Sequence, residues 1–468
     1  MALTESERPT RFPAKLSLAD IQSRVKAWLN DGGDRSLAQR VAGNAFLIRA
    51  AGAVLAYLSQ VVLARLMGSF EFGVYVYVWT WVMLIGGLVD LGLASGAQRF
   101  IPKYINEKSF ARLRGFLIGS RWVAFGIATV MGLLGVVCVR LVEPWLNDYT
   151  VVPLYLGCIA LPICGVLHTQ DAISRSYNWI NLALLPQYVV RQLLLILFMG
   201  ISYLLGFATD AVTTVVLAGA SMWVAAFDQM IVLNRRLSKA VTPGPKTYEV
   251  GSWLATSMPM KLVEGFYVIL MYTDVIILSQ FRSPDDVAIY YAAGKTLSFV
   301  AFVYFSVSAA ASHKFTEYHV AGERERLADF LAASIRWTFW PSLAGTVLIL
   351  TLGWPLLWLF GSRFVEGYHL MFILAIGVLA RASVGPGERL LNMLGEQKAC
   401  TLVVASTFAF NLVACLVLIP PYGDRRRDLG FGLVRDRIDL AFHRDQAPSR
   451  LPHLHLGKGT ITRRARSP

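Results

Sequence analysis

The sequence is poor in charge for its length. Only 16% of its 468 residues are Asp, Glu, Lys or Arg, whereas 55% are hydrophobic, and the mean hydropathy is +0.52. An ordinary soluble domain carries about 25% charged residues, so this composition excludes that class. We therefore expect an all-α, polytopic membrane protein.

Motifs for catalysis, cofactors and metals are also lacking. The sequence contains no GxxxxGK[ST], GxSxG or HExxH, and no pair of acidic residues on a sizeable loop, so we expect no enzymatic activity and no cofactor. Its five cysteines show no CxxC spacing, which argues against a zinc site or a disulfide framework. His168 and His313 are isolated, and we interpret both as residues of the membrane interface rather than as metal ligands.

The formal net charge of +14 would suggest a nucleic-acid partner in a soluble protein. In a membrane protein it is better explained by Lys and Arg gathered in cytoplasmic loops, so we expect no nucleic acid. Residues 1–40 interleave apolar and charged positions instead of forming a cleavable signal. They predict an amphipathic segment on the cytoplasmic membrane surface.

Eleven apolar segments are long enough to cross a bilayer of about 30 Å. They cover residues 42–66, 73–96, 114–140, 151–172, 183–206, 211–234, 252–281, 288–312, 332–360, 366–383 and 399–420. Lys and Arg concentrate in the connections that follow even-numbered segments, which predicts a cytoplasmic N-terminus. The expected domains are an N-terminal helical bundle (41–236, spans 1–6), a basic cytoplasmic linker (237–250) and a C-terminal bundle (251–423, spans 7–11).

The last part of the chain, 424–468, is rich in Arg and shows neither helical nor strand periodicity. If its Asp-Arg-Arg-Arg-Asp run is encoded by GAY and CGN codons, a shift of one nucleotide gives Ile or Thr, then mostly Ala, Gly or Val, then Ile or Thr. We hypothesise that this tail is out of frame and disordered, and that it replaces a twelfth span. The alternative is a genuine basic cytoplasmic tail, which after eleven spans would emerge on the outer side, against the positive-inside rule.

The stretch from Ser252 to Phe281 organises the chain, because it is long enough to span a bilayer yet contains Lys261, Glu264 and Asp274. Charges at that depth are costly and normally face a protein interior or a water-filled cavity. This segment is therefore predicted to line a cavity rather than to face lipid.

Other spans carry charges as well, namely Arg49, Asp90, Arg121, Arg191, Asp228, Lys295 and Arg381. For Arg121, Asp228 and Arg381, snorkelling to the interface is the simpler interpretation.

The cations Arg49, Arg191, Lys261 and Lys295 lie deeper in their spans, and such a set suits an anion such as phosphate or pyrophosphate. Asp274, with Glu264, is a candidate charge partner for one of them, or a proton or sodium site. A separate pattern, Gly92 and Gly96 in a GxxxG spacing, would let two helices approach closely.

Several short motifs occur in a characteristic order. They are Ala64-Arg-Leu-Met-Gly68, Glu71-Phe-Gly-Val-Tyr75 and Arg99-Phe-Ile-Pro-Lys-Tyr104, followed in the second half by Asp274-Val-Ile-Ile-Leu-Ser, Ala288-Ile-Tyr-Tyr-Ala-Ala-Gly-Lys295, the 360–368 segment and the 385–395 segment. From about residue 36 to 423 the chain resembles the bacterial polysaccharide biosynthesis transporters. These are O-antigen flippase-like members of the multidrug/oligosaccharidyl-lipid/polysaccharide exporter (MOP) superfamily.

The resemblance implies two pseudo-symmetric six-helix bundles, here with the twelfth helix lost. It also implies export of an undecaprenyl-pyrophosphate-linked oligosaccharide across the bacterial inner membrane by alternating access. Membrane lipids, a polysaccharide polymerase and glycosyltransferases are the implied partners. By position, Arg49, Lys261 and Lys295 would receive the pyrophosphate.

Two other functions compete with this one. A drug-cation exporter of the same fold would need a cavity dominated by Asp and Glu. A membrane-embedded glycosyltransferase or ligase would need a sizeable loop with acidic or His groups, and the sequence has no such loop.

Overall fold

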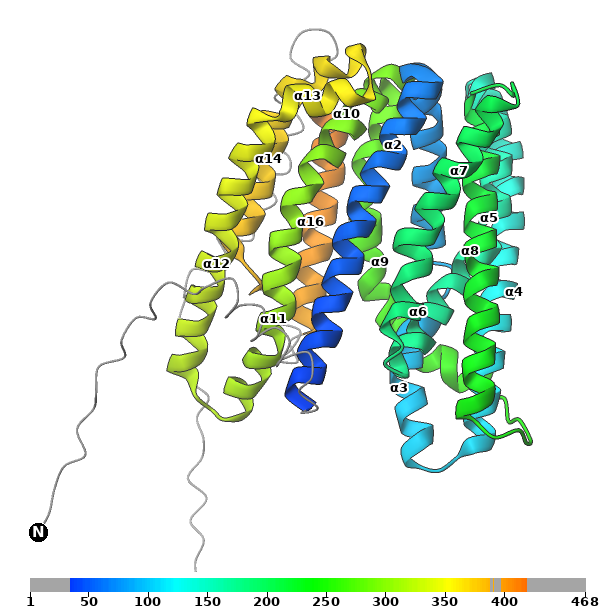
Figure 1. The fold of residues 1–468 in the computed structure, drawn as a ribbon, viewed down its shortest axis with the longest axis vertical. Helices are drawn as coiled ribbons and strands as arrows, with labels where there is room; N and C mark the ends of the chain where they lie inside the picture. The colour runs from blue at the N-terminus through cyan, green and yellow to red at the C-terminus, as the bar shows by residue number, and fades with distance from the viewer. Residues whose placement is uncertain (1–33, 388–389, 391–396, 419–468) are drawn as a thin grey trace, which may run out of the picture. The chain divides into compact units, whose positions relative to one another are not determined.

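The computed structural model describes residues 34–387, 390 and 397–418 (Figure 1). This part of the chain is built from helices and has no β-strand, as predicted. The α-helices are α2 (Asp34–Gly86), α3 (Leu93–Asn106), α4 (Phe110–Val142), α5 (Asp148–Ser176), α6 (Ile180–Leu185), α7 (Arg191–Leu204), α8 (Ala211–Ala240), α9 (Val250–Phe281), α10 (Pro284–Leu297), α11 (Ala301–Val320), α12 (Arg324–Thr351), α13 (Gly353–Phe360), α14 (Tyr368–Val384) and α16 (Gln397–Leu418). Short 3₁₀ or π turns are η1 (Glu143–Trp145), η2 (Pro186–Val190), η3 (Ser298–Val300) and η4 (Ser362–Gly367).

Eight helices of the described residues are long and apolar enough to cross a membrane, or nine if the bent pair α12 and α13 forms one span. Helix α2 counts once, although Gly68 interrupts it with φ 80° and ψ 173° between the first and second predicted spans. The short apolar helix Leu402–Val413 falls in the eleventh predicted span. Each predicted span therefore overlaps a helix. Residues 1–33 of the amphipathic segment, and the tail 424–468 with its frameshift hypothesis, lie outside the described residues.

Contacts divide the chain into two compact units. The first contains the described residues up to Phe302 together with Ile349–Tyr368. The second contains Val303–Leu348 and the described residues from His369 onward. The division into bundles at the linker 237–250 stays a prediction.

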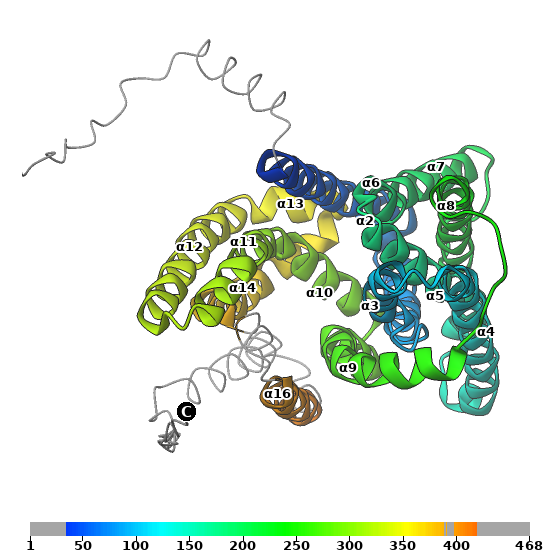
Figure 2. The ribbon, with the colours of Figure 1, turned by 90° about the horizontal axis from the view of Figure 1, so that it is seen from below.

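Within the first unit, α9 packs along α3 (Figure 2). Trp253 near the start of α9 is fully buried; its indole Nε1 donates to Tyr104 Oη at 3.2 Å, and its ring meets Phe116 edge-on at 5.1 Å. The two glycines show how close this contact is. A Cβ added at Gly92 would lie 2.2 Å from the backbone oxygen of Ser257, and one added at Gly96 would lie 2.2 Å from the Ser257 Oγ. The predicted close approach at this GxxxG pattern is confirmed.

The connections after the second and sixth predicted spans meet at one end of this unit, which we call the basic end. Thr247 N donates to Ala111 O at 3.0 Å, and Arg114 Nε donates to Pro245 O at 2.9 Å. Arg112 also pairs with Glu249 at 3.0 Å. The linker therefore lies on the start of α4.

The connections after the first, seventh and ninth predicted spans meet elsewhere in the unit, at what we call the Asp285 end. Arg363 Nη1 pairs with Asp285 Oδ1 at 3.0 Å, and Ser69 Oγ donates to the same carboxylate oxygen. A Cβ added at Gly73 would lie 1.8 Å from Pro284 O, so only glycine allows this approach of α10 to α2. Odd-numbered connections thus touch one another, as expected for helices that cross the membrane in alternation.

In the second unit, α11 and α12 pack through aromatic side chains. The ring of Phe330 lies 5.4 Å from that of Phe315 and 5.8 Å from that of Tyr318. The guanidinium of Arg381 in α14 lies 4.7 Å from the centre of the Tyr304 ring, which gives this intramembrane cation an aromatic partner.

Candidate functional site

The second predicted span is broken, and Asp90 lies in the break. The chain leaves the helical path over residues 87–92, where Gly92 has a φ of 82°, a conformation that glycine adopts without strain. The Asp90 side chain is fully buried, and its Oδ2 accepts a hydrogen bond of 3.2 Å from Ala94 N in the first turn of α3. A carboxylate is stabilised at this position by the unpaired N–H groups of the helix start.

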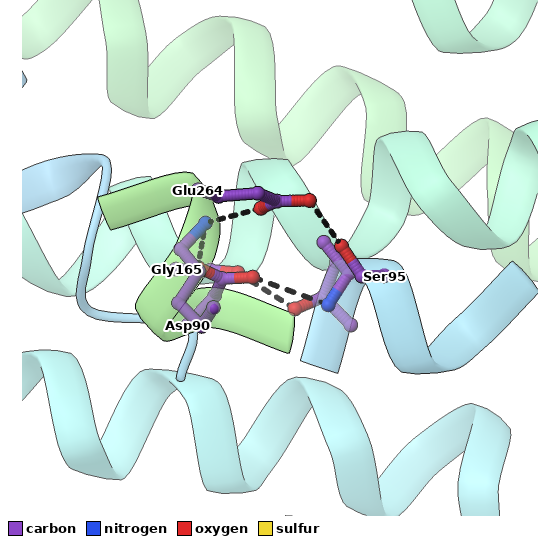
Figure 3. Close-up of polar contacts among 7 residues, drawn as sticks. Asp90, Ser95, Gly165 and Glu264 are labelled. Carbon is purple, nitrogen blue, oxygen red and sulfur yellow. Dashed lines mark hydrogen bonds and ion pairs between the residues drawn. The ribbon is translucent and has the colours of Figure 1, made fainter. Parts of the chain in front are cut away.

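Asp90 is paired with Lys261 of α9. Lys261 Nζ lies 2.9 Å from Asp90 Oδ1 and 3.3 Å from Glu264 Oε2. Ser95 Oγ in turn donates to Glu264 Oε1 at 2.8 Å, and these groups point toward one another in Figure 3. We call Asp90, Ser95, Lys261 and Glu264 the Asp90 network.

Exposure differs sharply within the Asp90 network. The side chain of Lys261 is 13% exposed and that of Asp90 is 0% exposed, whereas Glu264 is 50% exposed. A buried carboxylate needs its partner, because removing one member of such a pair costs about 3–5 kcal/mol. Lys261 is thus neutralised in this state and offers no open anion site.

Helix α5 carries a second group of polar residues beside the Asp90 network. The charges of the Asp90 network act on His168 of this helix. Arg175 grips Asp171 with two hydrogen bonds, Nε to Oδ1 at 3.1 Å and Nη2 to Oδ2 at 2.8 Å. Arg49 of α2 also acts electrostatically on Asp171. The Arg49 Nε atom is buried without a hydrogen-bond partner among the described residues.

Arg191 and Lys295, which we call the central cation pair, come from the fifth and eighth predicted spans. Arg191 follows the π turn η2, a rare conformation that frequently marks functional sites. Its charge acts on Lys295 and on the phenol groups of Tyr75 and Tyr291. In the part of the chain that the structure describes, neither cation forms an ion pair with a carboxylate.

Asp274 occupies a different environment. Its Oδ2 accepts a hydrogen bond of 2.6 Å from Tyr290 Oη, and its Oδ1 accepts one of 2.9 Å from Val275 N. It has no ion pair with Lys or Arg within the described ranges. Of the six predicted site residues, the structure pairs Lys261 with Glu264 at 3.3 Å, and the charge of Arg191 acts on Lys295, while Arg49 and Asp274 lie in other groups.

Sequence reasoning missed part of this arrangement. Asp90 was recognised as an intramembrane charge but assigned no role, and Ser95 was not considered. His168, expected at the interface, lies in the middle of α5 within the field of the Asp90 network. The available signal was the glycine-rich stretch 86–96, which predicts an interrupted helix around its one acidic residue.

Two models of known protein families match the sequence. Residues 42–312, more than half of the chain, match the family model described as polysaccharide biosynthesis protein. The chain belongs to this polysaccharide biosynthesis family. Residues 259–417 also match the MatE family model, so the two matches together cover most of the described helices. The family expected from the short motifs is confirmed.

Solved structures agree on the fold. An inward-facing multidrug resistance MATE family transporter of the MOP superfamily matches with a TM-score of 0.69 at 14% identity, over 83% of this chain and 92% of that chain. A MOP superfamily transporter from Pyrococcus furiosus, described as having a binding pocket of reverse polarity, matches with a TM-score of 0.60 at 13% identity, over 86% and 93%. No curated protein matches the sequence. The chain is thus a membrane transporter of the MOP superfamily.

Proposed function

We propose that this transporter exports an undecaprenyl-pyrophosphate-linked oligosaccharide across the bacterial inner membrane, for synthesis of a surface polysaccharide such as O-antigen lipopolysaccharide. The observation that carries the proposal is the central cation pair. Arg191 and Lys295 lie within membrane-spanning helices, act on each other electrostatically and have no carboxylate partner among the described residues. Two cations left unneutralised at this depth call for an anionic ligand.

Pyrophosphate fits the chemistry of this pair. A guanidinium can hold two phosphate oxygens at once, and an ammonium meets them as a point charge. Each charge-assisted hydrogen bond contributes about 1.5–3 kcal/mol. Lys261 would join Arg191 and Lys295 in binding the anion only after its contacts with Asp90 and Glu264 are broken. Anion binding would then be linked to separation of α9 from α3.

The proposed orientation follows from the distribution of Lys and Arg. The basic end would face the cytoplasm and the Asp285 end the outside, with the N-terminus in the cytoplasm. Cargo would then enter from the inner leaflet, where glycosyltransferases assemble it, and leave toward a polysaccharide polymerase.

Export of organic cations is the alternative. It would require carboxylates facing the transported molecule, and Glu264, half exposed, and Asp274 are the available groups. The two functions can be separated in proteoliposomes that contain the full-length chain. One set would carry a fluorescent undecaprenyl-pyrophosphate-linked oligosaccharide, and a second set would carry ethidium as the organic cation.

We expect export of the lipid-linked sugar, reduced about ten-fold or more in Arg191→Ala and Lys295→Ala, since one lost contact of about 1.5–3 kcal/mol corresponds to that factor. Arg140→Ala is the matched control, because this arginine is 75% exposed and pairs with nearby Glu143. Full activity of the Arg191→Ala, Lys295→Ala double variant, or transport of ethidium alone, would overturn the proposal.

A further inference from the structure

A pocket of about 110 Å³ lies at the Asp285 end, between α2, the start of α5 and the connection from α9 to α10. Its wall includes three aromatic rings and three polar side chains, contributed by Tyr77, Trp145, Tyr149, Asn147, Gln280 and Arg282. All of them belong to the first unit. The pocket is separate from the Asp90 network and from the central cation pair.

The three aromatic residues of the pocket wall differ in exposure. Tyr77 is 8% exposed, Tyr149 is 39% exposed and Trp145 is 81% exposed. Phe70 holds the Tyr149 ring in an edge-on contact at 5.1 Å. The exposed indole of Trp145 and the braced phenol of Tyr149 offer flat apolar faces to a ligand.

Hydrogen-bonding groups accompany these rings. Gln280 Nε2 donates to Tyr77 Oη at 3.3 Å, which leaves the amide oxygen of Gln280 as an acceptor for a ligand. Asn147 stands at the start of α5, but its side chain makes no capping hydrogen bond to that helix. Arg282 also lines the wall. The wall thus combines aromatic rings with hydrogen-bonding groups, so the pocket suits a molecule with an apolar face and a hydroxylated edge.

We propose that this pocket binds a single sugar ring, with the C–H face of the ring on Trp145 and Tyr149 and its hydroxyl groups on Gln280 and Asn147. Its volume is below the about 300–1,000 Å³ of pockets that enclose a drug-sized ligand, which limits the occupant to one ring of a longer glycan. The inference rests on the proposed function, because it assigns the site to the carbohydrate part of the cargo.

The pocket also depends on the closed Asp285 end. Its wall includes both Gly73 of α2 and Pro284 of α10, whose contact is so close that a Cβ at Gly73 would lie 1.8 Å from Pro284 O. Sugar bound there favours the state in which α2 and α10 touch, because a ligand shifts a conformational equilibrium toward the state that it binds better.

The test uses the full chain in lipid nanodiscs and methyl β-D-glucopyranoside as the probe, with binding followed by saturation-transfer difference NMR. Sorbitol, an open-chain polyol without a ring face, is the control ligand. We expect saturable binding of the glucoside and none of sorbitol. Trp145→Ala and Gln280→Ala should each weaken binding by about three- to ten-fold, the range of a single ring contact or hydrogen bond.

Trp122→Ala is the matched control, because Trp122 is 69% exposed on α4 and does not line the pocket. Thermal unfolding of each variant shows whether it is folded, and Tyr149→Ala provides a second ring deletion. Absence of glucoside binding, equal binding of sorbitol, or binding unchanged in both Trp145→Ala and Gln280→Ala would overturn the inference. The proposed function has its own readout in Arg191→Ala and Lys295→Ala export, so either idea can fail alone.

Discussion

Lys261 of α9 and Asp90, in the break before α3, form an ion pair of 2.9 Å whose carboxylate is fully buried. The pair joins the seventh predicted span to the second. It sits beside the glycines that let α9 approach α3, so charge and close packing act on the same contact. We infer that this ion pair holds the first part of α9 against α3.

Removing one partner should cost more than removing both. Asp90→Asn leaves Lys261 without its buried partner, and we expect it to lower the free energy of unfolding by about 3–5 kcal/mol. The Asp90→Asn, Lys261→Met double variant should recover much of this loss, because it buries no unpaired charge. Thermal unfolding of the purified chain, followed by size-exclusion chromatography, measures the difference.

Glu264→Gln is the control for that series. Glu264 is 50% exposed, so its pairing with Lys261 should contribute about 0–1 kcal/mol. If Asp90→Asn were as stable as Glu264→Gln, or if the double variant were less stable than Asp90→Asn, the inference that this ion pair holds α9 against α3 would be wrong.

Gly92, just before α3, and Gly96 within α3 should respond differently to alanine. In Gly92→Ala the new Cβ meets the backbone oxygen of Ser257 and the residue keeps a φ of 82°, so we expect a loss of about 1–3 kcal/mol. In Gly96→Ala the new Cβ clashes with the Ser257 Oγ at 2.2 Å, whereas its next contacts, the Ser257 Cβ at 3.4 Å and the Phe100 Cδ2 at 3.6 Å, are at ordinary distances. Adding Ser257→Gly should rescue Gly96→Ala and leave Gly92→Ala impaired, as measured by thermal unfolding; equal rescue of both would contradict this reading of the contact.

The helical class could be predicted from the apolar composition. Each of the eleven predicted spans overlaps a helix, although only eight or nine of the described helices are long and apolar enough to cross a membrane. The break at 87–92 is indicated only by the glycines of 86–96, since residues 73–96 are otherwise apolar enough to continue as one helix. Tertiary contacts determine where the helix breaks, because Asp90 pairs with Lys261 and accepts a hydrogen bond from the first turn of α3. The same reasoning explains why Asp90 could not be predicted as the partner of Lys261, because no sequence pattern shows that a carboxylate from another span lies 2.9 Å away.

Within the central cation pair, charge and geometry can be separated. Arg191→Lys keeps the charge but loses the planar fork that holds two phosphate oxygens, so we expect export of the lipid-linked sugar to be intermediate between wild type and Arg191→Ala. Lys295→Arg keeps the charge in a larger side chain and should retain most of the activity. Initial export rates in proteoliposomes measure both, and equal activity of Arg191→Lys and Arg191→Ala would show that charge alone is not the requirement.

Opening of the Asp285 end should depend on Arg363 and Asp285. The Arg363 side chain is 58% exposed and that of Asp285 is 16% exposed, so the pair should contribute about 0–1 kcal/mol. At its upper end this energy changes the population of an open state by about five-fold.

A cysteine at Thr296, which is fully buried in this state, would report the open state through its reaction with a water-soluble maleimide. In the Thr296→Cys background we expect Arg363→Asp to raise the labelling rate and the Asp285→Arg, Arg363→Asp exchange to return it toward the starting value. The chain without Thr296→Cys gives the background from its native cysteines. Labelling that is the same in all three proteins would mean that this ion pair does not control opening.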